Sequence, residues 1–282
     1  MGLKGAAIGG FAGWFFAGPL GSLLGSIVGS WVENQVEAQN RAEAGRRRSR
    51  GPRVTPNYGR SSGGTNRDML FCACAAALLA KIAKADGVVT PGEIEAVETA
   101  FRRLGFSAAA RAYAVNVFRK AKDDDHTAYE YAYDFANAVP SVEIRELLYE
   151  LLWDVACADG RIGPEELAIL RQIPIPLGVR AGWYEYFARE RIRGYAGNER
   201  RQYRRRQEPP RRDPLADAYE LLGASAADDD ATLKRKYREL AKKYHPDALR
   251  AQGLPDEMIG KANERMAKIN AAWSEIKSSR NL

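Results

Sequence analysis

The chain has 282 residues, 45% of them hydrophobic and 28% charged, and it carries a net charge of +7. This composition excludes a fully disordered chain, and the positive charge favours acidic partners such as nucleic acid, anionic lipid or an acidic protein face. Three cysteines and two histidines are too few for a disulfide framework or a histidine-based metal site, and they favour a reducing compartment.

The first 35 residues contain a long apolar run. Residues 5–32 have no ionisable side chain, and crossing a bilayer takes about 20 residues. The sequence therefore predicts a transmembrane helix and assigns residues 1–35 to a membrane anchor. A cleaved signal peptide is disfavoured because the run is long and only Lys4 precedes it. The other alternative is a hairpin that turns at Gly18-Pro19, but each of its arms would be too short to span the bilayer.

Small residues recur at every fourth position of this run, a spacing at which two helix backbones can approach closely. The row favours a homodimer through the transmembrane helix, although glycine is common in membrane helices generally. The glycines of this predicted membrane dimer face are Gly5, Gly9, Gly13, Gly21, Gly25 and Gly29. Only Lys4 precedes the run, whereas six arginines follow within residues 41–53. This asymmetry places the N-terminus outside and the later domains in the cytoplasm.

Two arginine-rich segments lack an apolar period and predict linkers. Residues 36–66 form a flexible basic linker whose arginines suit anionic lipid headgroups. Residues 191–213 form an Arg-rich linker in which tyrosine is interleaved with arginine, as in some RNA-binding segments. Because no folded RNA-binding motif accompanies it, a solvated spacer is favoured and a nucleic-acid partner is not expected.

Residues 67–190, between the linkers, show helical periodicity throughout and no alternating strand pattern. This pattern predicts an all-α bundle. Residues 79–97 and 152–170 repeat each other, so we expect two related helix-turn-helix units. Gly87 and Gly160 suit the left-handed position after a helix. Pro91 and Pro164 suit the first position of the helix that follows.

Other residues of this region are assigned to its core and to its helix ends. Ser107 and Ser141 are expected to cap helices. Tyr149 and Trp153 lie four residues apart on an apolar helix, so we expect them in the core rather than around a cofactor. The cysteines lie among alanine and leucine, which predicts unreactive buried thiols at Cys72, Cys74 and Cys157.

The repeated A-D-G-x-[VI]-x-P-[GE]-E pattern is similar to that of the TerB-like family of tellurite-resistance-associated domains. Each copy carries two carboxylates, which raises the alternative of a divalent cation site. The metal candidates are Asp86, Glu93, Asp159 and Glu166. Helix capping explains almost every residue of the pattern and is favoured, since an EF-hand would need more oxygen ligands at closer spacing. We therefore predict no metal and no cofactor, with the metal site as the alternative.

Residues 228–247 predict a basic amphipathic helix. Its apolar face consists of Leu233, Tyr237, Leu240, Ala241 and Tyr244. Lysine and arginine occupy the other side, and three aspartates precede the helix at the positive end of its dipole. Pro246 ends the helix and biases His245 toward an extended conformation.

Three separated blocks make residues 214–282 resemble a J domain: residues 219–223 (YELLG), the helix that ends in His245-Pro246-Asp247, and residues 269–276 (INAAWSEI). The resemblance implies an antiparallel helical hairpin with an HPD loop. It also implies a DnaK-type chaperone as partner, which binds the basic helix and whose ATP hydrolysis the HPD residues trigger. The chaperone-binding residues implied are Lys234, Arg235, Arg238, Lys242, Lys243, His245, Pro246 and Asp247. Glu239 departs from the family pattern, which usually has a basic residue there.

The order of anchor, TerB-like bundle, basic linker and J domain resembles the membrane-anchored DnaJ-like co-chaperones of the DjlA type. This resemblance implies a single-pass inner-membrane protein that stimulates another protein's ATPase. We predict that the chain is not an enzyme, since its sequence shows no acid/base pair, nucleophile elbow or phosphate loop. The alternative is a membrane-tethered scaffold or envelope-stress sensor that acts through the TerB-like bundle, with or without bound metal.

Overall fold

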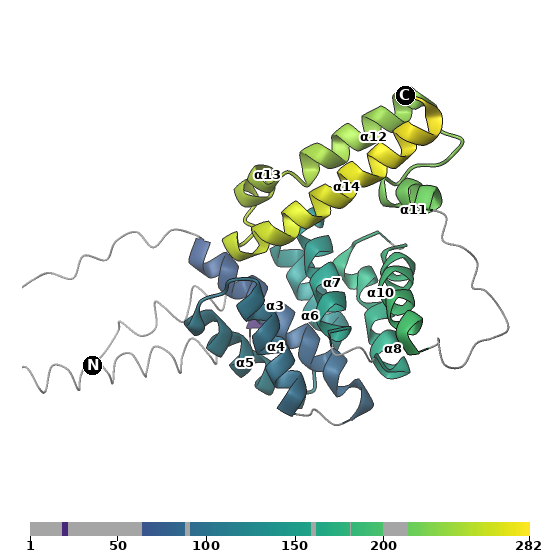
Figure 1. The fold of residues 1–282 in the computed structure, drawn as a ribbon. Helices are drawn as coiled ribbons and strands as arrows, with labels where there is room; N and C mark the ends of the chain where they lie inside the picture. The colour runs from purple at the N-terminus through teal and green to yellow at the C-terminus, as the bar shows by residue number, and fades with distance from the viewer. Residues whose placement is uncertain (1–18, 22–63, 88–90, 159–161, 181, 200–213) are drawn as a thin grey trace, which may run out of the picture.

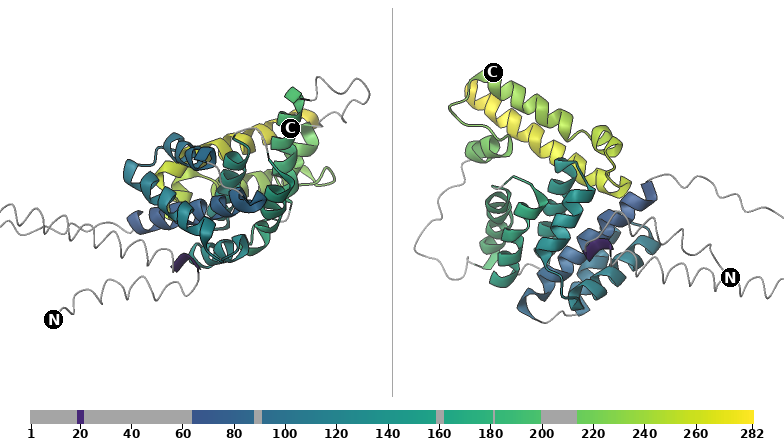
Figure 2. Two further views of the ribbon diagram at one scale, coloured as in Figure 1. Left: turned by 90° about the horizontal axis from the view of Figure 1, so that it is seen from below. Right: turned by 180° about the vertical axis from the view of Figure 1, so that it is seen from behind.

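The computed structural model describes residues 19–21, 64–87, 91–158, 162–180, 182–199 and 214–282. All regular secondary structure in these ranges is helical, which confirms the predicted all-α class. None of the helices in these ranges has both the length and the apolar character needed to cross a bilayer. Apart from Pro19–Gly21, the predicted span and its dimer face lie outside the described residues. The short segment 19–21 lies beside the bundle (purple in Figure 2). Leu20 is buried there, and its N–H donates to Asp134 Oδ2 at 3.1 Å.

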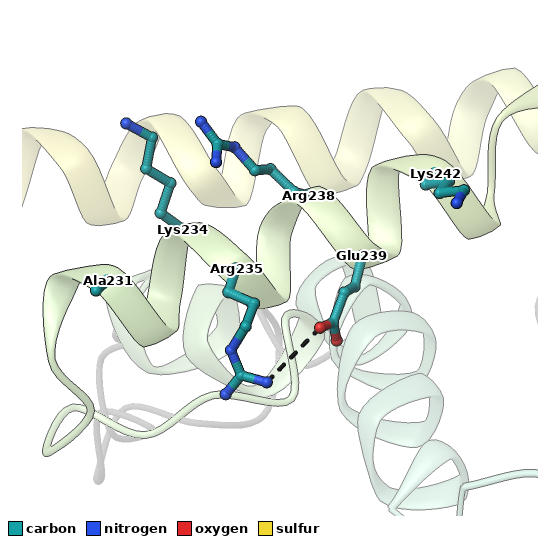
Figure 3. Close-up of a pocket in the computed structure, with 6 residues that line it drawn as sticks. All are labelled: Ala231, Lys234, Arg235, Arg238, Glu239 and Lys242. Atoms are coloured by element: carbon teal, nitrogen blue, oxygen red, sulfur yellow. Dashed lines mark ion pairs between the residues drawn. The ribbon is translucent and has the colours of Figure 1, made fainter.

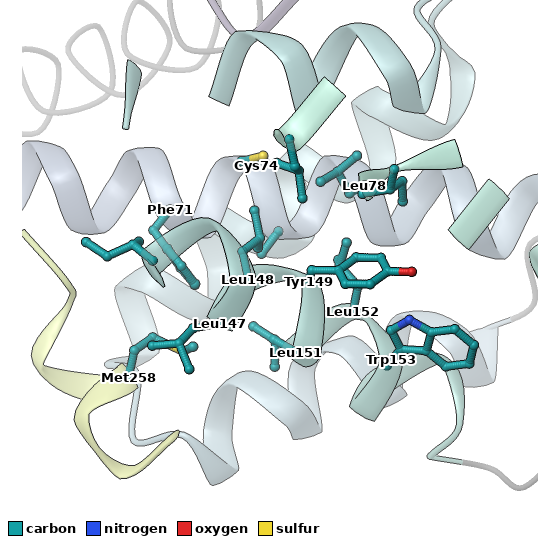
Figure 4. Packing of buried hydrophobic residues seen from close by; sticks show 14 of the residues in the cluster. Phe71, Cys74, Leu78, Leu147, Leu148, Tyr149, Leu151, Leu152, Trp153 and Met258 are labelled. Carbon is teal, nitrogen blue, oxygen red and sulfur yellow. The ribbon is translucent and has the colours of Figure 1, made fainter. Parts of the chain in front are cut away.

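The bundle, residues 64–199, is organised around helix α3 (Gly64–Ala83). Every residue from Phe71 to Ala80 in α3 is buried, and the alanines among them allow neighbouring helices to approach closely. The neighbours are α4 (Pro91–Arg103), α5 (Ala108–Asp123), α6 (Ala128–Ala138) and α7 (Val142–Ala156). Tyr149 and Trp153 of α7 are completely buried beside α3 (Figure 4), which confirms that they belong to the core.

The predicted helix punctuation is confirmed where the structure describes it. Gly87 takes a φ of +93° after the short 3-10 helix η1 (Lys84–Asp86). Ser107 and Ser141 accept hydrogen bonds from the N–H groups of Ala110 and Ile144. Helices α4 and α8 (Pro164–Gln172) both begin at proline. The described glycine and proline residues of the repeat therefore lie at the ends of helices.

The predicted start of the second linker, at residue 191, is wrong. Helix α9 (Pro174–Leu177) is followed by α10 (Trp183–Glu199), which continues through that boundary. The Arg191 side chain is only 12% exposed and pairs with Asp154 and Glu190. Because its guanidinium joins α10 to α7, Arg191 belongs to the bundle rather than to a solvated spacer.

The C-terminal domain, residues 214–282, is a helical hairpin (Figure 1). Its elements are α11 (Pro214–Leu221), α12 (Asp230–Lys243), α13 (Pro246–Ala251), the 3-10 helix η2 (Asp256–Met258) and α14 (Ile259–Arg280). Leu233 of α12 is fully buried, and the Tyr237 ring stacks on Trp273 of α14 with centroids 5.0 Å apart. These contacts confirm the predicted hairpin. Near its start, α14 passes over the bundle at α7 (Figures 1 and 2).

Candidate functional site

The outer side of α12 carries an exposed basic groove. Asp229 caps the helix, since its Oδ1 accepts from the Thr232 N–H at 2.7 Å. With Leu233 buried in the hairpin, most of the charged residues of α12 are left facing solvent. The basic groove has a volume of about 490 Å³ and is lined by Ala231, Lys234, Arg235, Arg238, Glu239 and Lys242 (Figure 3). Four of the predicted binding residues therefore lie together on one surface.

Glu239 reduces the positive charge of this groove. Its Oε1 lies 3.6 Å from Arg235 NH1, one helical turn earlier (Figure 3). Both side chains are more than half exposed, so this pair contributes little to stability. The main consequence of this pair is a lower positive charge in the basic groove, because the Arg235 cation already has a counter-ion within the helix.

The His245-Pro246-Asp247 segment, here called the HPD segment, follows α12 directly. His245 has the predicted extended backbone, with φ −61° and ψ 130°, and its Nδ1 accepts from the Asp247 N–H at 3.2 Å. Pro246 ends α12, as predicted, but it also begins α13, which the sequence reading missed. The His245 and Asp247 side chains are 56% and 78% exposed. The HPD segment is thus a rigid helix start whose side chains are available to a partner.

Lys243 and Tyr244 connect the end of α12 to the bundle. Lys243 Nζ lies 3.9 Å from Glu143 Oε1, so this predicted binding residue faces α7 rather than the basic groove. Tyr244 is buried, and its hydroxyl donates to Glu146. Burial and the neighbouring Glu146 raise the Tyr244 pKa well above its usual value, so the hydroxyl keeps its proton as donor. The residue that precedes the HPD segment is therefore anchored.

A buried ionic cluster lies between the bundle and the C-terminal domain, and sequence reasoning missed it. At its centre, Glu150 of α7 is completely buried. Its carboxylate oxygens lie 3.1 Å from Lys268 Nζ, 3.4 Å from Arg265 Nε, and 3.6 Å from Lys261 Nζ and Arg191 NH2. Three of these four cations come from α14, and the carboxylate comes from the bundle.

The sequence does contain a signal for this ionic cluster. Acidic residues recur along α7 at helical spacing, at Glu143, Glu146, Glu150 and Asp154, within a helix whose other residues are apolar except for Arg145. Basic residues recur in the same way at the start of α14, at Lys261, Arg265 and Lys268. Complementary charged stripes on two helices are compatible with packing of one helix against the other, because buried charges need partners of opposite sign. Neither stripe alone identifies its partner.

The ionic cluster makes stability depend on acid pH. Burial raises the Glu150 pKa, but the surrounding cations lower it more, to about 2 from 4.5. Because the folded-state pKa lies below the unfolded value, the ionised carboxylate stabilises the fold fully above pH 4.5. That contribution is lost as the pH falls toward 2. The groups that face Glu150 are Arg191, Lys261, Arg265 and Lys268, with Glu146, Asp154 and Glu190 nearby.

We therefore expect the unfolding temperature to fall across this pH window, and to fall less steeply in Glu150→Gln, which cannot lose a charge there. Thermal unfolding followed by circular dichroism at a series of pH values measures both slopes. Equal slopes in the two proteins would show that other carboxylates cause the acid sensitivity.

Of the four metal candidates, only Glu166 has a side chain that the structure describes. Glu166 Oε2 accepts from the Gly163 N–H at 2.7 Å and so caps α8. Asp159 and the side chains of Asp86 and Glu93 lie outside the described part, and the backbone of Asp86 ends η1. Within the described ranges, no three His, Cys, Asp or Glu side chains are grouped as a metal site requires. The thiols of Cys72 and Cys74 are buried, and burial raises the pKa of Cys74 well above its usual value.

Comparisons with known proteins cover both folded parts. Residues 73–185 match the family described as tellurite resistance protein TerB, and residues 217–281 match the DnaJ domain. The co-chaperone protein DjlA of Vibrio parahaemolyticus is 31% identical over 243 residues, which cover 82% of this chain and 86% of the relative. DjlA of Escherichia coli K12 is 31% identical over 219 residues, 76% of this chain and 81% of the relative. No solved structure gives a significant match.

Proposed function

Because the chain belongs to the DjlA family of co-chaperones, we propose that it stimulates ATP hydrolysis by a cytoplasmic DnaK-type chaperone and performs no catalysis itself. One observation carries this proposal: the HPD segment and the basic groove are exposed side by side at the end of α12. The other side of the same domain is buried against the bundle. The surface left free is therefore the one that the DnaJ family pattern assigns to the chaperone.

The geometry suggests different roles for the two parts of this surface. The lysines and arginines of the basic groove are exposed, and exposed charges mainly steer association and set its salt dependence. Asp247 stands at the start of α13, where its carboxylate is 3.7 Å from Arg250 and largely exposed. A chaperone arginine that binds this carboxylate would desolvate both groups. Truncating one member of such a pair costs about 2–5 kcal/mol.

Single-turnover ATP hydrolysis by the chaperone, with and without the full chain in detergent micelles, tests the proposal. We expect a faster rate that saturates with added chain and weakens as salt is raised. An unchanged rate at saturating concentration would overturn it. A second test addresses the scaffold alternative, since a scaffold that acts through the bundle would keep its cellular phenotype after deletion of residues 214–282.

The ion pair of Glu239 predicts a gain in affinity. In Glu239→Gln, Arg235 loses its internal counter-ion while the helix keeps a side chain of similar size. We expect tighter chaperone binding by about 0.2–1 kcal/mol, the range for an exposed pair, mainly through faster association. Stopped-flow binding at two salt concentrations measures it. The matched control is Glu275→Gln on the exposed side of α14, which should leave the association rate unchanged.

We also propose that residues 5–32 anchor the chain in the inner membrane with its folded parts in the cytoplasm. The uncharged length of this run and the arginines after it support the proposal. Insertion would replace the contact between Leu20 and Asp134 with lipid. Carbonate extraction of cell membranes tests the anchor: release of the chain into the soluble fraction would contradict it. Crosslinking of a Gly13→Cys variant tests the proposed dimer face.

A further inference from the structure

We propose that the acidic stripe of α7 is a docking site for the chain's own C-terminal domain, and that docking holds the HPD segment and the basic groove in one orientation on the bundle. The acidic stripe consists of Glu143, Glu146, Glu150 and Asp154. What docking means for the chaperone rests on the proposed function, whereas the docking itself does not.

Charge complementarity is the first support for this docking. The acidic stripe meets the basic start of α14, where Lys261 pairs with Asp154 and lies 3.6 Å from Glu150. Lys268 bridges the two bundle helices, since its Nζ is 3.1 Å from Glu150 and 2.9 Å from Glu190 of α10. The cations come mainly from one domain and the carboxylates from the other. Separating the domains would therefore leave Arg191 as the only one of these four cations beside the Glu150 carboxylate.

Burial at Arg265 is the second support. Its side chain is 1% exposed, and its guanidinium carbon lies 4.1 Å from the centre of the Trp183 ring and 5.4 Å from that of Phe187. Both rings belong to α10 of the bundle, while the Tyr244 ring of the C-terminal domain lies 5.6 Å away on the other side. A guanidinium enclosed by aromatic rings and one carboxylate is desolvated, and such cation–π contacts are stronger than exposed ones. This arrangement exists only when the two domains are together.

Further contacts surround this centre, so the docking is not a single pair. Met258 of η2 is completely buried and lies near Leu147 of α7 (Figure 4). At the other side of the interface, Arg180 donates to the carbonyl oxygens of Glu220 and Leu221 at 2.7 and 3.4 Å. Arg189 also forms an ion pair with the Glu220 carboxylate. The interface therefore combines the buried ionic cluster with a buried apolar side chain and with further polar contacts.

Contacts of the last turn of α12 with the bundle connect the docking to the proposed chaperone-binding surface. Tyr244 is hydrogen-bonded to Glu146 and directly precedes His245. Lys243 faces Glu143 from the same turn. The last turn of α12 is therefore held by α7, while the side chains of His245, Asp247 and the basic groove stay exposed to solvent. The C-terminal domain thus uses two basic surfaces, one on α14 for the bundle and one on α12 for an external partner.

Distances between two nitroxide labels in the full chain test the docking without any chaperone. Labels at Tyr129→Cys on α6 and Glu275→Cys on α14 occupy exposed positions in the two domains, in a background that carries Cys157→Ser. We expect one narrow distance distribution. Lys268→Glu places a carboxylate against Glu150 and Glu190, and we expect it to broaden the distribution. Adding Glu190→Lys should narrow it again.

Lys277→Glu is the matched control, because it makes the same charge change on an exposed position of α14 and should leave the distribution narrow. If Lys268→Glu loses helical structure, Arg189→Glu replaces it, since its side chain and that of Glu220 are each more than a third exposed. We expect that variant to broaden the distribution through repulsion of Glu220. A broad distribution in the unmodified chain, or a narrow one in the folded charge-reversal variants, would overturn the proposal. Neither result depends on ATPase stimulation.

Discussion

Replacing Asp247 with Asn is expected to abolish stimulation of the chaperone's ATPase while leaving the fold of the chain intact. The side chain is 78% exposed, and its nearest internal partner, Arg250, lies 3.7 Å away and also pairs with Asp256. The structure therefore loses little when the charge is removed. A chaperone arginine bound to this carboxylate would lose its counter-ion, at about 2–5 kcal/mol. The lower value already corresponds to a loss of roughly 30-fold.

His245→Gln is expected to have the same effect for a related reason. The His245 Nδ1 accepts from the Asp247 N–H, and the oxygen of a glutamine side chain can accept the same hydrogen bond. The cap of α13 is kept, whereas the imidazole offered to the partner is lost. Single-turnover hydrolysis, with circular dichroism of each variant, separates loss of contact from loss of structure.

Asp256→Asn is the matched control for these variants. Asp256 is 79% exposed and binds the same Arg250, at 2.9 Å from Nε, so it has the charge, the exposure and the neighbour of Asp247. We expect normal stimulation from this variant. If Asp256→Asn reduces stimulation as strongly as Asp247→Asn, general negative charge near α13 matters and the HPD segment has no special role.

Replacing Glu150 with Ala is expected to lower the free energy of unfolding by about 3–5 kcal/mol, the usual cost of removing one partner from a buried ion pair. The reason is the surrounding charge: Arg265 is 1% exposed and Lys261 7% exposed, and neither can reach water without separating the domains. Urea unfolding followed by circular dichroism measures the loss. We expect the C-terminal domain to unfold in a separate transition at a lower urea concentration, because the substitution removes the α7 carboxylate that its cations contact.

Glu98→Ala is the control for this prediction, because it makes the same change at an exposed position of α4 and should shift the midpoint little. A second comparison replaces both charges, in Glu150→Leu with Arg265→Leu. The double variant also removes Arg265, the most buried cation of the ionic cluster, so one fewer buried charge is left without a partner and we expect the double variant to be more stable than Glu150→Ala. Equal stability of Glu150→Ala and the unmodified chain would show that the ionic cluster does not hold the domains together.

Local rules in the sequence determined the elements of the chaperone-binding surface. Asp229 caps the start of α12, and Pro246 ends the helix. The helical spacing of its apolar and charged residues leaves the basic side exposed. The HPD segment and the caps at Ser107 and Ser141 depend only on neighbours within a few residues. Periodicity and capping over one or two helical turns therefore predicted α12 and its basic side, whereas the hairpin and the binding role of four groove residues came from the resemblance to J domains.

The tertiary structure alone decided how these elements are arranged against each other. Lys243 was assigned to the chaperone surface but faces Glu143, and Arg191 was assigned to a linker but is enclosed between α7 and α10. From sequence alone, a charged residue is expected to be solvated unless its partner is known. Such a partner can be distant in the chain, as Glu150 and Lys268 are, 118 residues apart. The energy of a charge depends on its burial and on the opposite charge beside it. Both are properties of the packed domains, so the orientation of the HPD segment on the bundle appears only in three dimensions.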